Sequence, residues 1–419
     1  GHLQQLNIAG ADSKTRMMVE RAIPYLDARI QEDYDNLIKH KVKTDQNNLS
    51  YHAAYYFYAR SYFNDIPIAE KNKKASDYYK SQVQQYWTKQ GIYAQGMIAL
   101  ALYRSGDKKT AASILKSLKE NAIVHEELGM YWKSNSSGYY WYEAPVETQA
   151  LLIEAFDEAG NDVASVDAMK LWLLKQKQTN EWKSTKATAE AVYALLLRGS
   201  TWLMNEPAIT VSLGKQVVDL SKTNAEPGTG YYKTSWKENE ITPQMGSIKV
   251  VRKSSEDGVS WGAVYWQYFE QLDKITPAAT PLSLKKKLYL QRNSAAGPVL
   301  ELITASTILH PGDLVKVVVE LRTDRDMEYV HMKDMRAACF EPMNVLSGYQ
   351  WQDGLGYYEE TRDAATNFFF DYLRKGTYVF EYPLRVQLKG DFSNGITTIQ
   401  CMYAPEFTSH SEGVRVIVK

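Results

Sequence analysis

The strongest constraint on this chain is a pattern that occurs twice in its first half. Each copy has a tryptophan-bearing loop that leads into an apolar helix rich in Thr and Ala, and the copies are Gly138–Phe156 and Glu181–Leu197. Thr148 and Thr188 hold matching places, 40 residues apart. This is the length of a helical hairpin with its loop, and such hairpins stack because one alone cannot bury its apolar face.

Residues 1–205 contain further helices at a similar spacing. The apolar helices are expected to begin near Tyr51, Ile92, Val146 and Ala187, each beside a more polar helix. Their small residues allow them to converge on a centre, which favours an α/α toroid over an open superhelix.

The second half alternates apolar and polar residues, which predicts strands. Residues 206–275 hold about four strands, among them 232–236 and 259–265, too few for a closed sandwich. Residues 276–419 predict an antiparallel β-sandwich. The aromatic segment Arg336–Phe370 breaks the pattern and is expected to be a long loop.

Composition excludes several classes of protein. With 49 basic and 49 acidic residues among 419, no excess charge drives binding to nucleic acid. No run of about 18 apolar residues predicts a membrane span. Gly1 has the look of a residue left by tag removal, so the natural N-terminus is expected to lie upstream, and the missing targeting signal is uninformative about compartment.

Neither metal nor cofactor chemistry has support in the sequence. The seven histidines form no ligand-type pair, and the helical half has no cysteine, which disfavours the zinc sites of toroidal prenyltransferases. Walker, GxGxxG and GxSxG motifs are absent, so no cofactor is expected. Cys339 and Cys401 are compatible with one disulfide or with two buried thiols.

Carboxylates near aromatic residues leave two interpretations open. Glu143, Glu147 and Glu154 lie near Trp141, as a glycosidase site requires, or they cap and bond packed helices. Trp141 itself can stack on a sugar or can act as a wedge between hairpins. The packing interpretation is preferred in both cases.

Several segments resemble the thioester domain and the domains that follow it in bacterial alpha-2-macroglobulins. The helical motifs are Gly129–Trp132, Trp141–Leu151 and above all Trp182–Leu195. Val259–Trp266 is similar to the end of the family's split CUB-type sheet, and Asp324–Asp334 to its last macroglobulin-type sandwich. The resemblance implies three domains: a thioester-type toroid (1–205), the second half of a CUB-like domain (206–275) and a macroglobulin sandwich (276–419).

The chain departs from the family in one respect. The family's reactive Cys-x-Glu-Gln segment does not occur, and no cysteine precedes Cys339. No catalytic residue is therefore assigned, and the chain is expected to be the C-terminal part of a larger protein.

The resemblance implies a protease inhibitor that traps proteases by a conformational change, and not an enzyme. Implied partners are proteases, through the full-length protein, and upstream macroglobulin domains of the same chain, but no nucleic acid. The implied location is the periplasm or cell surface, with membrane contact only through an N-terminal lipid anchor of the full-length protein. Tyr349, Trp351, Tyr357 and Tyr358 are the candidate interdomain aromatic surface, ordinary sandwich packing being the alternative.

Two other classes remain open. A toroid followed by β-sandwiches is also the layout of some polysaccharide lyases, for which Tyr139, Tyr140 and His125 would be acid and base. A glycan-binding protein without chemistry would instead depend on Trp141.

Overall fold

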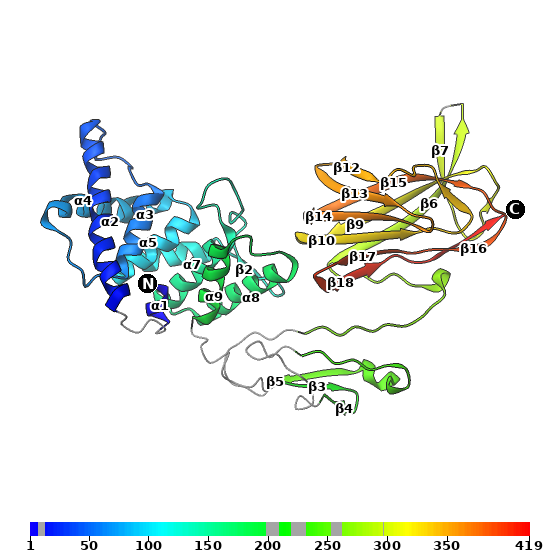
Figure 1. Ribbon diagram of the computed structural model, residues 1–419, viewed down its shortest axis with the longest axis horizontal. Helices are drawn as coiled ribbons and strands as arrows, with labels where there is room; N and C mark the ends of the chain where they lie inside the picture. The colour runs from blue at the N-terminus through cyan, green and yellow to red at the C-terminus, as the bar shows by residue number, and fades with distance from the viewer. Residues whose placement is uncertain (7–12, 198–208, 219–231, 253–261, 296) are drawn as a thin grey trace. The chain divides into compact units, whose positions relative to one another are not determined.

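The computed structural model describes residues 1–6, 13–197, 209–218, 232–252, 262–295 and 297–419. The chain forms two compact units, residues 1–175 with 182–260, and residues 176–181 with 261–419. The first contains the helices and a small sheet, and the second contains a β-sandwich (Figure 1). The mixed α and β fold class is confirmed, whereas the three domain boundaries stay a prediction.

The helical unit alternates inner and outer helices. Its described helices are α1 (His2–Gln5), α2 (Ser13–Lys39), α3 (Tyr51–Ser61), α4 (Glu70–Tyr86), α5 (Ile92–Arg104), α6 (Lys108–Glu120), α7 (Pro145–Glu158), α8 (Val163–Thr179) and α9 (Thr185–Leu196). A hairpin of β1 (Ile123–His125) and β2 (Gly129–Tyr131) precedes α7.

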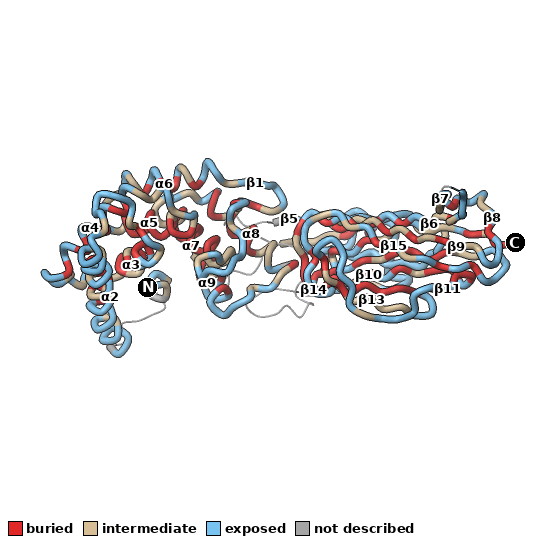
Figure 2. The backbone as a smooth tube through the Cα atoms, turned by 90° about the horizontal axis from the view of Figure 1, so that it is seen from above, coloured by how far each residue is buried: buried red, intermediate tan, exposed pale blue. Residues whose placement is uncertain are grey.

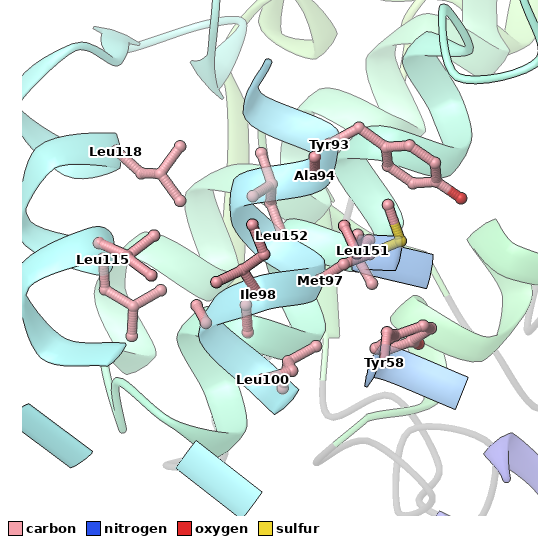
Figure 3. Packing of buried hydrophobic residues seen from close by; sticks show 14 of the residues in the cluster. Tyr58, Tyr93, Ala94, Met97, Ile98, Leu100, Leu115, Leu118, Leu151 and Leu152 are labelled. Atoms are coloured by element: carbon pink, nitrogen blue, oxygen red, sulfur yellow. The ribbon is translucent and has the colours of Figure 1, made fainter. Parts of the chain in front are cut away.

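The inner helices are α3, α5, α7 and α9, and they contact one another in chain order. Their starts agree with the four positions expected from the sequence. Gly96 lets α5 pack closely on α7, because a Cβ there would lie 2.9 Å from a methyl carbon of Leu152, which would have to shift. Figure 3 shows α5 residues such as Ile98 packed against Leu152, and Figure 2 shows buried residues along these helices. The hairpin repeat is therefore confirmed.

Helix boundaries follow local capping where the sequence supplies a cap. Asp107, at the start of α6, accepts a hydrogen bond from the backbone N–H of Thr110 at 3.1 Å. Helix α2 continues through Pro24. Pro24 is exposed, so water can bond the carbonyl that its missing N–H leaves open.

A second sheet of the first unit has the order β4-β3-β5, formed by β3 (Ile209–Leu213), β4 (Gln216–Val217) and β5 (Ile248–Arg252). The strand expected at 232–236 is wrong, because these residues pair with no strand in the described part of the chain. Of the strand expected at 259–265, residues 259–261 lie outside the described residues, and the described residues 262–265 are not in a strand. Short 3-10 turns elsewhere are η1 (Trp87–Lys89), η4 (Glu238–Glu240), η5 (Pro243–Gly246) and η6 (Leu272–Lys274).

The second unit is the antiparallel sandwich expected from the sequence. One sheet has the order β12-β13-β14-β10-β17-β18, a second β11-β15-β9-β6-β7 and a small third β16-β19-β8. The strands are β6 (Leu282–Ser294), β7 (Gly297–Leu302), β8 (Ile308–Leu309), β9 (Leu314–Thr323), β10 (Met327–Met335), β11 (Phe340–Pro342), β12 (Gly348–Gln352), β13 (Leu355–Thr361), β14 (Ala365–Leu373), β15 (Gly376–Val386), β16 (Gly390–Asn394), β17 (Thr397–Cys401), β18 (Ala404–His410) and β19 (Val414–Val418).

The segment Arg336–Phe370, expected to be a loop, is mostly strand. It contains β11, β12 and β13 and most of β14. Phe368 and Phe370 alternate inward from β14 into the core, which accounts for the aromatic run. Cys339 and Cys401 are both buried and free, so the interpretation as two buried thiols is confirmed.

Candidate functional site

The four aromatic residues singled out in the sandwich lie on the hairpin β12–β13, but they face different ways. Tyr349 and Trp351 on β12 are 81% and 78% exposed. Tyr358 pairs with Tyr349 across the hairpin, with ring centroids 5.2 Å apart, and is partly buried. Tyr349, Trp351 and Tyr358 thus remain candidates for a contact surface, and that role stays a prediction.

Tyr357 is a correction to the candidate surface. It is only 7% exposed and packs in the sandwich core, where its ring lies 5.4 Å from that of Phe380. Adjacent residues of a strand point to opposite faces, so Tyr357 and Tyr358 cannot both face outward. Tyr357 belongs to the core.

A buried polar cluster is the most elaborate arrangement of side chains in the helical unit. Its centre is Glu154 on α7, which is 2% exposed. Tyr58 donates its hydroxyl to Glu154 Oε2 at 2.6 Å, and Tyr193 donates to Oε1 at 3.1 Å. Tyr62 also donates to Oε1. Three inner helices, α3, α7 and α9, therefore meet on one carboxylate.

Arg104, at the end of α5, supplies the balancing charge. Its Nη2 lies 2.7 Å from Glu154 Oε1, and its Nε donates to Glu158 Oε1 at 2.8 Å. The guanidinium also lies 4.0 Å from the ring centre of Tyr62, a cation–π distance. Buried charges are tolerated when paired and hydrogen-bonded in this way. Glu154 is thus bonded within the helix packing, as the preferred interpretation expected.

His2 and Glu190 complete the cluster. The His2 ring stacks on Tyr193 at 3.8 Å, and its Nε2 lies 2.9 Å from the Tyr58 hydroxyl. Its Nδ1 is 3.5 Å from Glu190 Oε2. Burial raises the pKa of the Glu190 carboxyl to about 7, although Lys186 opposes the shift. Burial lowers the pKa of His2, although Glu154 opposes this.

The side chains of this cluster are suited to binding and releasing protons and do not form an evident site for group transfer. Burial and the nearby Glu154 raise the pKa values of Tyr58, Tyr62 and Tyr193, so these hydroxyls stay neutral donors at ordinary pH. The titratable members of the cluster are Glu190, whose pKa is raised to about 7, and His2, whose pKa is lowered from its ordinary value. A cavity of about 610 Å³, lined in part by Glu154 and Tyr193, adjoins the cluster.

Trp141 lies in a separate aromatic cluster. It is partly exposed, and the edges of Tyr51, Tyr55 and Tyr93 surround it with ring centroids 5.8 to 6.3 Å away. Lys186 Nζ lies 5.9 Å from its ring. These contacts come from α3, α5 and α9, so Trp141 packs where hairpins meet, as expected for a wedge.

The residues that a lyase would use have separate surroundings. His125 Nδ1 accepts the backbone N–H groups of Glu127 and Leu128 at 3.1 and 3.2 Å in an exposed turn. Tyr139 is almost fully exposed and contacts Tyr140 edge-on at 5.6 Å. The structure therefore provides no shared hydrogen bond that would make them an acid and base pair among the described residues.

The described residues offer neither a metal-ligand cluster nor a membrane-spanning helix. Among the described residues, no three His, Cys, Asp or Glu side chains gather as metal ligands would. Within those residues, no helix combines the length and the apolar character needed to cross a bilayer.

The sequence indicates Glu154 as a candidate residue but does not indicate most of its hydrogen-bond partners. Tyr58, Tyr62, Arg104 and Tyr193 lie far from Glu154 in the chain. The available signal was a single acidic residue within Leu151–Phe156 and a single basic residue at the end of α5. A charge on an otherwise apolar helix predicts a buried partner but does not identify it.

Comparisons with known proteins relate the second unit to one domain family. Residues 282–406 match the bacterial alpha-2-macroglobulin MG10 domain. Among curated proteins, none matches the sequence.

Solved structures similar to the chain are bacterial alpha-2-macroglobulins. A Salmonella protein, mutant Y1175G, aligns with 96% of this chain and 24% of its own, at 14% identity and a TM-score of 0.31. Trypsin-activated Escherichia coli alpha-2-macroglobulin aligns with 88% of this chain and 25% of its own, at 14% identity and a TM-score of 0.37. A native Escherichia coli fragment, from domain MG7 to the C-terminus, aligns with 100% of this chain and 70% of its own, at 13% identity and a TM-score of 0.29. The chain thus spans about a quarter of the length of the first of these proteins.

Proposed function

We propose that this chain, whose residues 282–406 match the bacterial alpha-2-macroglobulin MG10 domain, is the C-terminal part of a protease inhibitor of that family that encloses its target. The observation that carries the proposal is the match of residues 282–406, which covers most of the sandwich. The helical motifs before it, above all Trp182–Leu195, support the same origin.

The proposed inhibition is conformational. Cleavage of an upstream segment by a protease triggers a rearrangement that encloses the protease, and no turnover follows. One Escherichia coli relative is described as activated by porcine elastase and another as activated by trypsin, which makes proteases the partners to test first. Upstream macroglobulin domains of the same chain would supply the rest of the enclosure.

The proposal does not depend on covalent capture by this chain. Within its 419 residues no Cys-x-Glu-Gln segment occurs, and both thiols lie buried in the sandwich. Burial also raises the pKa of Cys339 to about 11, which keeps that thiol protonated and unreactive. Under this proposal, the 419 residues of this chain contribute to enclosure through their shape.

The proposed location is the periplasm or the cell surface, where foreign proteases are met. This location rests on the family resemblance alone. It would be tested by fractionating the source cells and detecting the protein with an antibody in the periplasmic, membrane and cytoplasmic fractions.

Co-elution of protease and inhibitor tests the proposal. The full-length protein is incubated with elastase or trypsin and passed through a size-exclusion column under native conditions. We expect the protease to elute with the inhibitor. Separate elution under native conditions would contradict enclosure.

A further inference from the structure

A lysine lies inside the sandwich at a place where the strand pattern favours an apolar residue. On β6 the inward positions alternate, and Lys286 falls between the buried Leu284 and Leu288. Its neighbours Lys285 and Lys287 are exposed. The Lys286 side chain is only 1% exposed. A lysine is rarely buried so completely, so its surroundings need an account.

Its partner is an equally buried aspartate on the opposite sheet. Lys286 Nζ lies 2.6 Å from Oδ1 of Asp334 on β10, whose side chain is 0% exposed. Strand β6 belongs to the five-stranded sheet and β10 to the six-stranded sheet, so the contact crosses the sandwich.

Two backbone carbonyls fix the direction of the Lys286 amine. Nζ donates to the carbonyl oxygens of Met335 at 2.7 Å and Gly395 at 2.9 Å. Gly395 is required there, because a Cβ would lie 2.2 Å from the Cβ of Met335. A neutral amine has two N–H groups and one lone pair. In the ionised pair, the third N–H of the ammonium donates to Asp334 Oδ1. Once that proton passes to the carboxylate, both remaining N–H groups stay on the carbonyls and the lone pair takes this third direction, toward Asp334.

The Asp334 carboxyl group receives hydroxyl donors at both oxygens. Thr397 donates to Oδ1 at 2.7 Å, and Tyr382 donates to Oδ2. Such donors stabilise negative charge that develops on a carboxyl oxygen during addition of a nucleophile. Burial lowers the pKa of Lys286, which favours the neutral amine.

We propose that Lys286 and Asp334 condense to an intramolecular amide cross-link that joins the two sheets. Removing water from two ionised groups is costly, and conversion of the pair to a neutral amide ends that cost. The sandwich has no disulfide between its described cysteines, so the amide would be its covalent staple. The inference concerns the second unit alone and does not rest on the proposed function.

The reaction needs no oxidant or other reactant. One proton passes from the Lys286 ammonium to the Asp334 carboxylate, which gives an amine and a carboxylic acid. The nitrogen lone pair then forms a bond to Cγ, and the carbonyl electron pair moves onto Oδ2, where Tyr382 donates. When the carbonyl reforms, the Cγ–Oδ1 bond breaks, and Oδ1 leaves as water with a second proton from Nζ. One N–H remains on the amide.

The cross-link would act as a disulfide does on the unfolded chain. Lys286 and Asp334 are 48 residues apart, so the bond closes a long loop and restricts the unfolded ensemble. It would also hold β6, the first strand of the sandwich, against β10.

Mass spectrometry of the purified 419-residue chain, denatured and reduced, tests the proposal. We expect a mass lower by one water molecule than the sequence requires. Proteolytic digestion should then give a branched peptide that joins the segments containing Lys286 and Asp334. A wild-type mass equal to that of the sequence would overturn the proposal, whatever the behaviour of the variants.

Two variants locate the loss of water. Lys286→Met should restore the full mass, whereas the matched change Lys287→Met, at an exposed position next to it, should leave the water loss in place. If Lys286→Met still lacks one water, the dehydration lies elsewhere and the proposal is wrong. Tyr382→Phe should leave a measurable fraction of chains without the cross-link, a result that a purely packing role of Tyr382 would not produce.

Discussion

Glu154 accepts hydrogen bonds from Tyr58, Tyr193 and Arg104, which come from three other helices. The change Glu154→Gln keeps its shape but leaves Arg104 with less compensating charge and gives the tyrosine hydroxyls a poorer acceptor. Breaking a buried pair of this kind costs about 3 kcal/mol. We expect the free energy of unfolding of the helical unit to fall by about this amount. Urea denaturation measures the loss, with hydrogen exchange of peptides from α5 and α7 as the signal.

The matched control for Glu154 is Glu120→Gln on α6. Glu120 and Lys116 form an exposed pair 3.9 Å apart. Its loss should cost less than about 0.5 kcal/mol. An equal effect of the two substitutions would show that the buried cluster contributes no more than a surface ion pair.

Glu190 should give the helical unit a pH dependence. Its folded pKa of about 7 exceeds its ordinary value of 4.5, so the folded state holds a proton that the unfolded state has released. Stability from this group is therefore full below about pH 4.5 and is lost as the pH rises to about 7, by up to about 3 kcal/mol.

The Glu190→Gln variant isolates that contribution. His2, whose pKa is lowered, acts in the opposite direction below its ordinary value of 6.5, and the lowered pKa values of Asp107 and Asp162 act near and below pH 4. The measurement is therefore the stability difference between wild type and variant in urea at about pH 5 and about pH 8. We expect wild type to lose stability relative to the variant as the pH rises. A constant difference would refute the assignment.

At the scale of elements, the hairpin β1–β2 is seated on α8 through Gly129. This residue has φ +76°, and a Cβ there would lie 2.1 Å from the backbone oxygen of Ala168. Gly129→Ala combines backbone strain with a clash and should destabilise the helical unit by more than about 2 kcal/mol. Gly106→Ala is the control, because Gly106 has φ +93° but open space around it, and about 1 kcal/mol is expected. Thermal unfolding of both variants compares them, and equal losses would exclude a role for the contact with α8.

The hairpin β12–β13 gives a second comparison between elements. Tyr357→Ala removes a core ring and should cost the sandwich about 3 to 5 kcal/mol. Trp351→Ala removes an exposed ring and should cost within about 0.5 kcal/mol. The free energy of unfolding of each variant is measured by chemical denaturation, with alkylation of the buried thiols Cys339 and Cys401 as the signal that the sandwich has unfolded. A large loss for Trp351→Ala would mean that the ring packs within the sandwich and is not free for a contact surface.

The elements that the sequence predicts well are those whose signal is local. Inner helices start where apolar periodicity begins, and Asp107 caps α6 as its place after Gly106 predicts. Strands at 232–236 were predicted wrongly because alternation shows a preference for one buried face but supplies no pairing partner. The loop expected at Arg336–Phe370 was wrong because its dense aromatic residues obscured the alternation that β13 and β14 use.

The candidate sites depended on distant residues and were therefore harder to predict. Nothing near Glu154 in sequence indicates Tyr58 or Arg104, and nothing near Lys286 indicates Asp334. A run of three lysines on a strand does place one of them inward by alternation, which is a signal that could have found Lys286. Asp334 is identified as the partner of Lys286 only in the folded sandwich, where the sheets that contain β6 and β10 face each other.

Considered as a whole molecule, the chain is proposed to be the C-terminal part of a larger inhibitor. Its toroid-type helices and MG10 sandwich are two compact units, which suits a protein that rearranges by moving domains. Enclosure and ordinary blocking of an active site differ in one respect, which is whether small substrates still reach the protease.

The most direct test compares two substrates of the same protease. The full-length protein is mixed with trypsin or elastase, and the residual activity is measured on a large protein substrate and on a short chromogenic peptide. The account predicts that cleavage of the large substrate falls strongly while cleavage of the peptide persists, because the enclosed protease keeps an open active site. Full cleavage of both substrates would contradict inhibition, and equal loss of both would contradict enclosure.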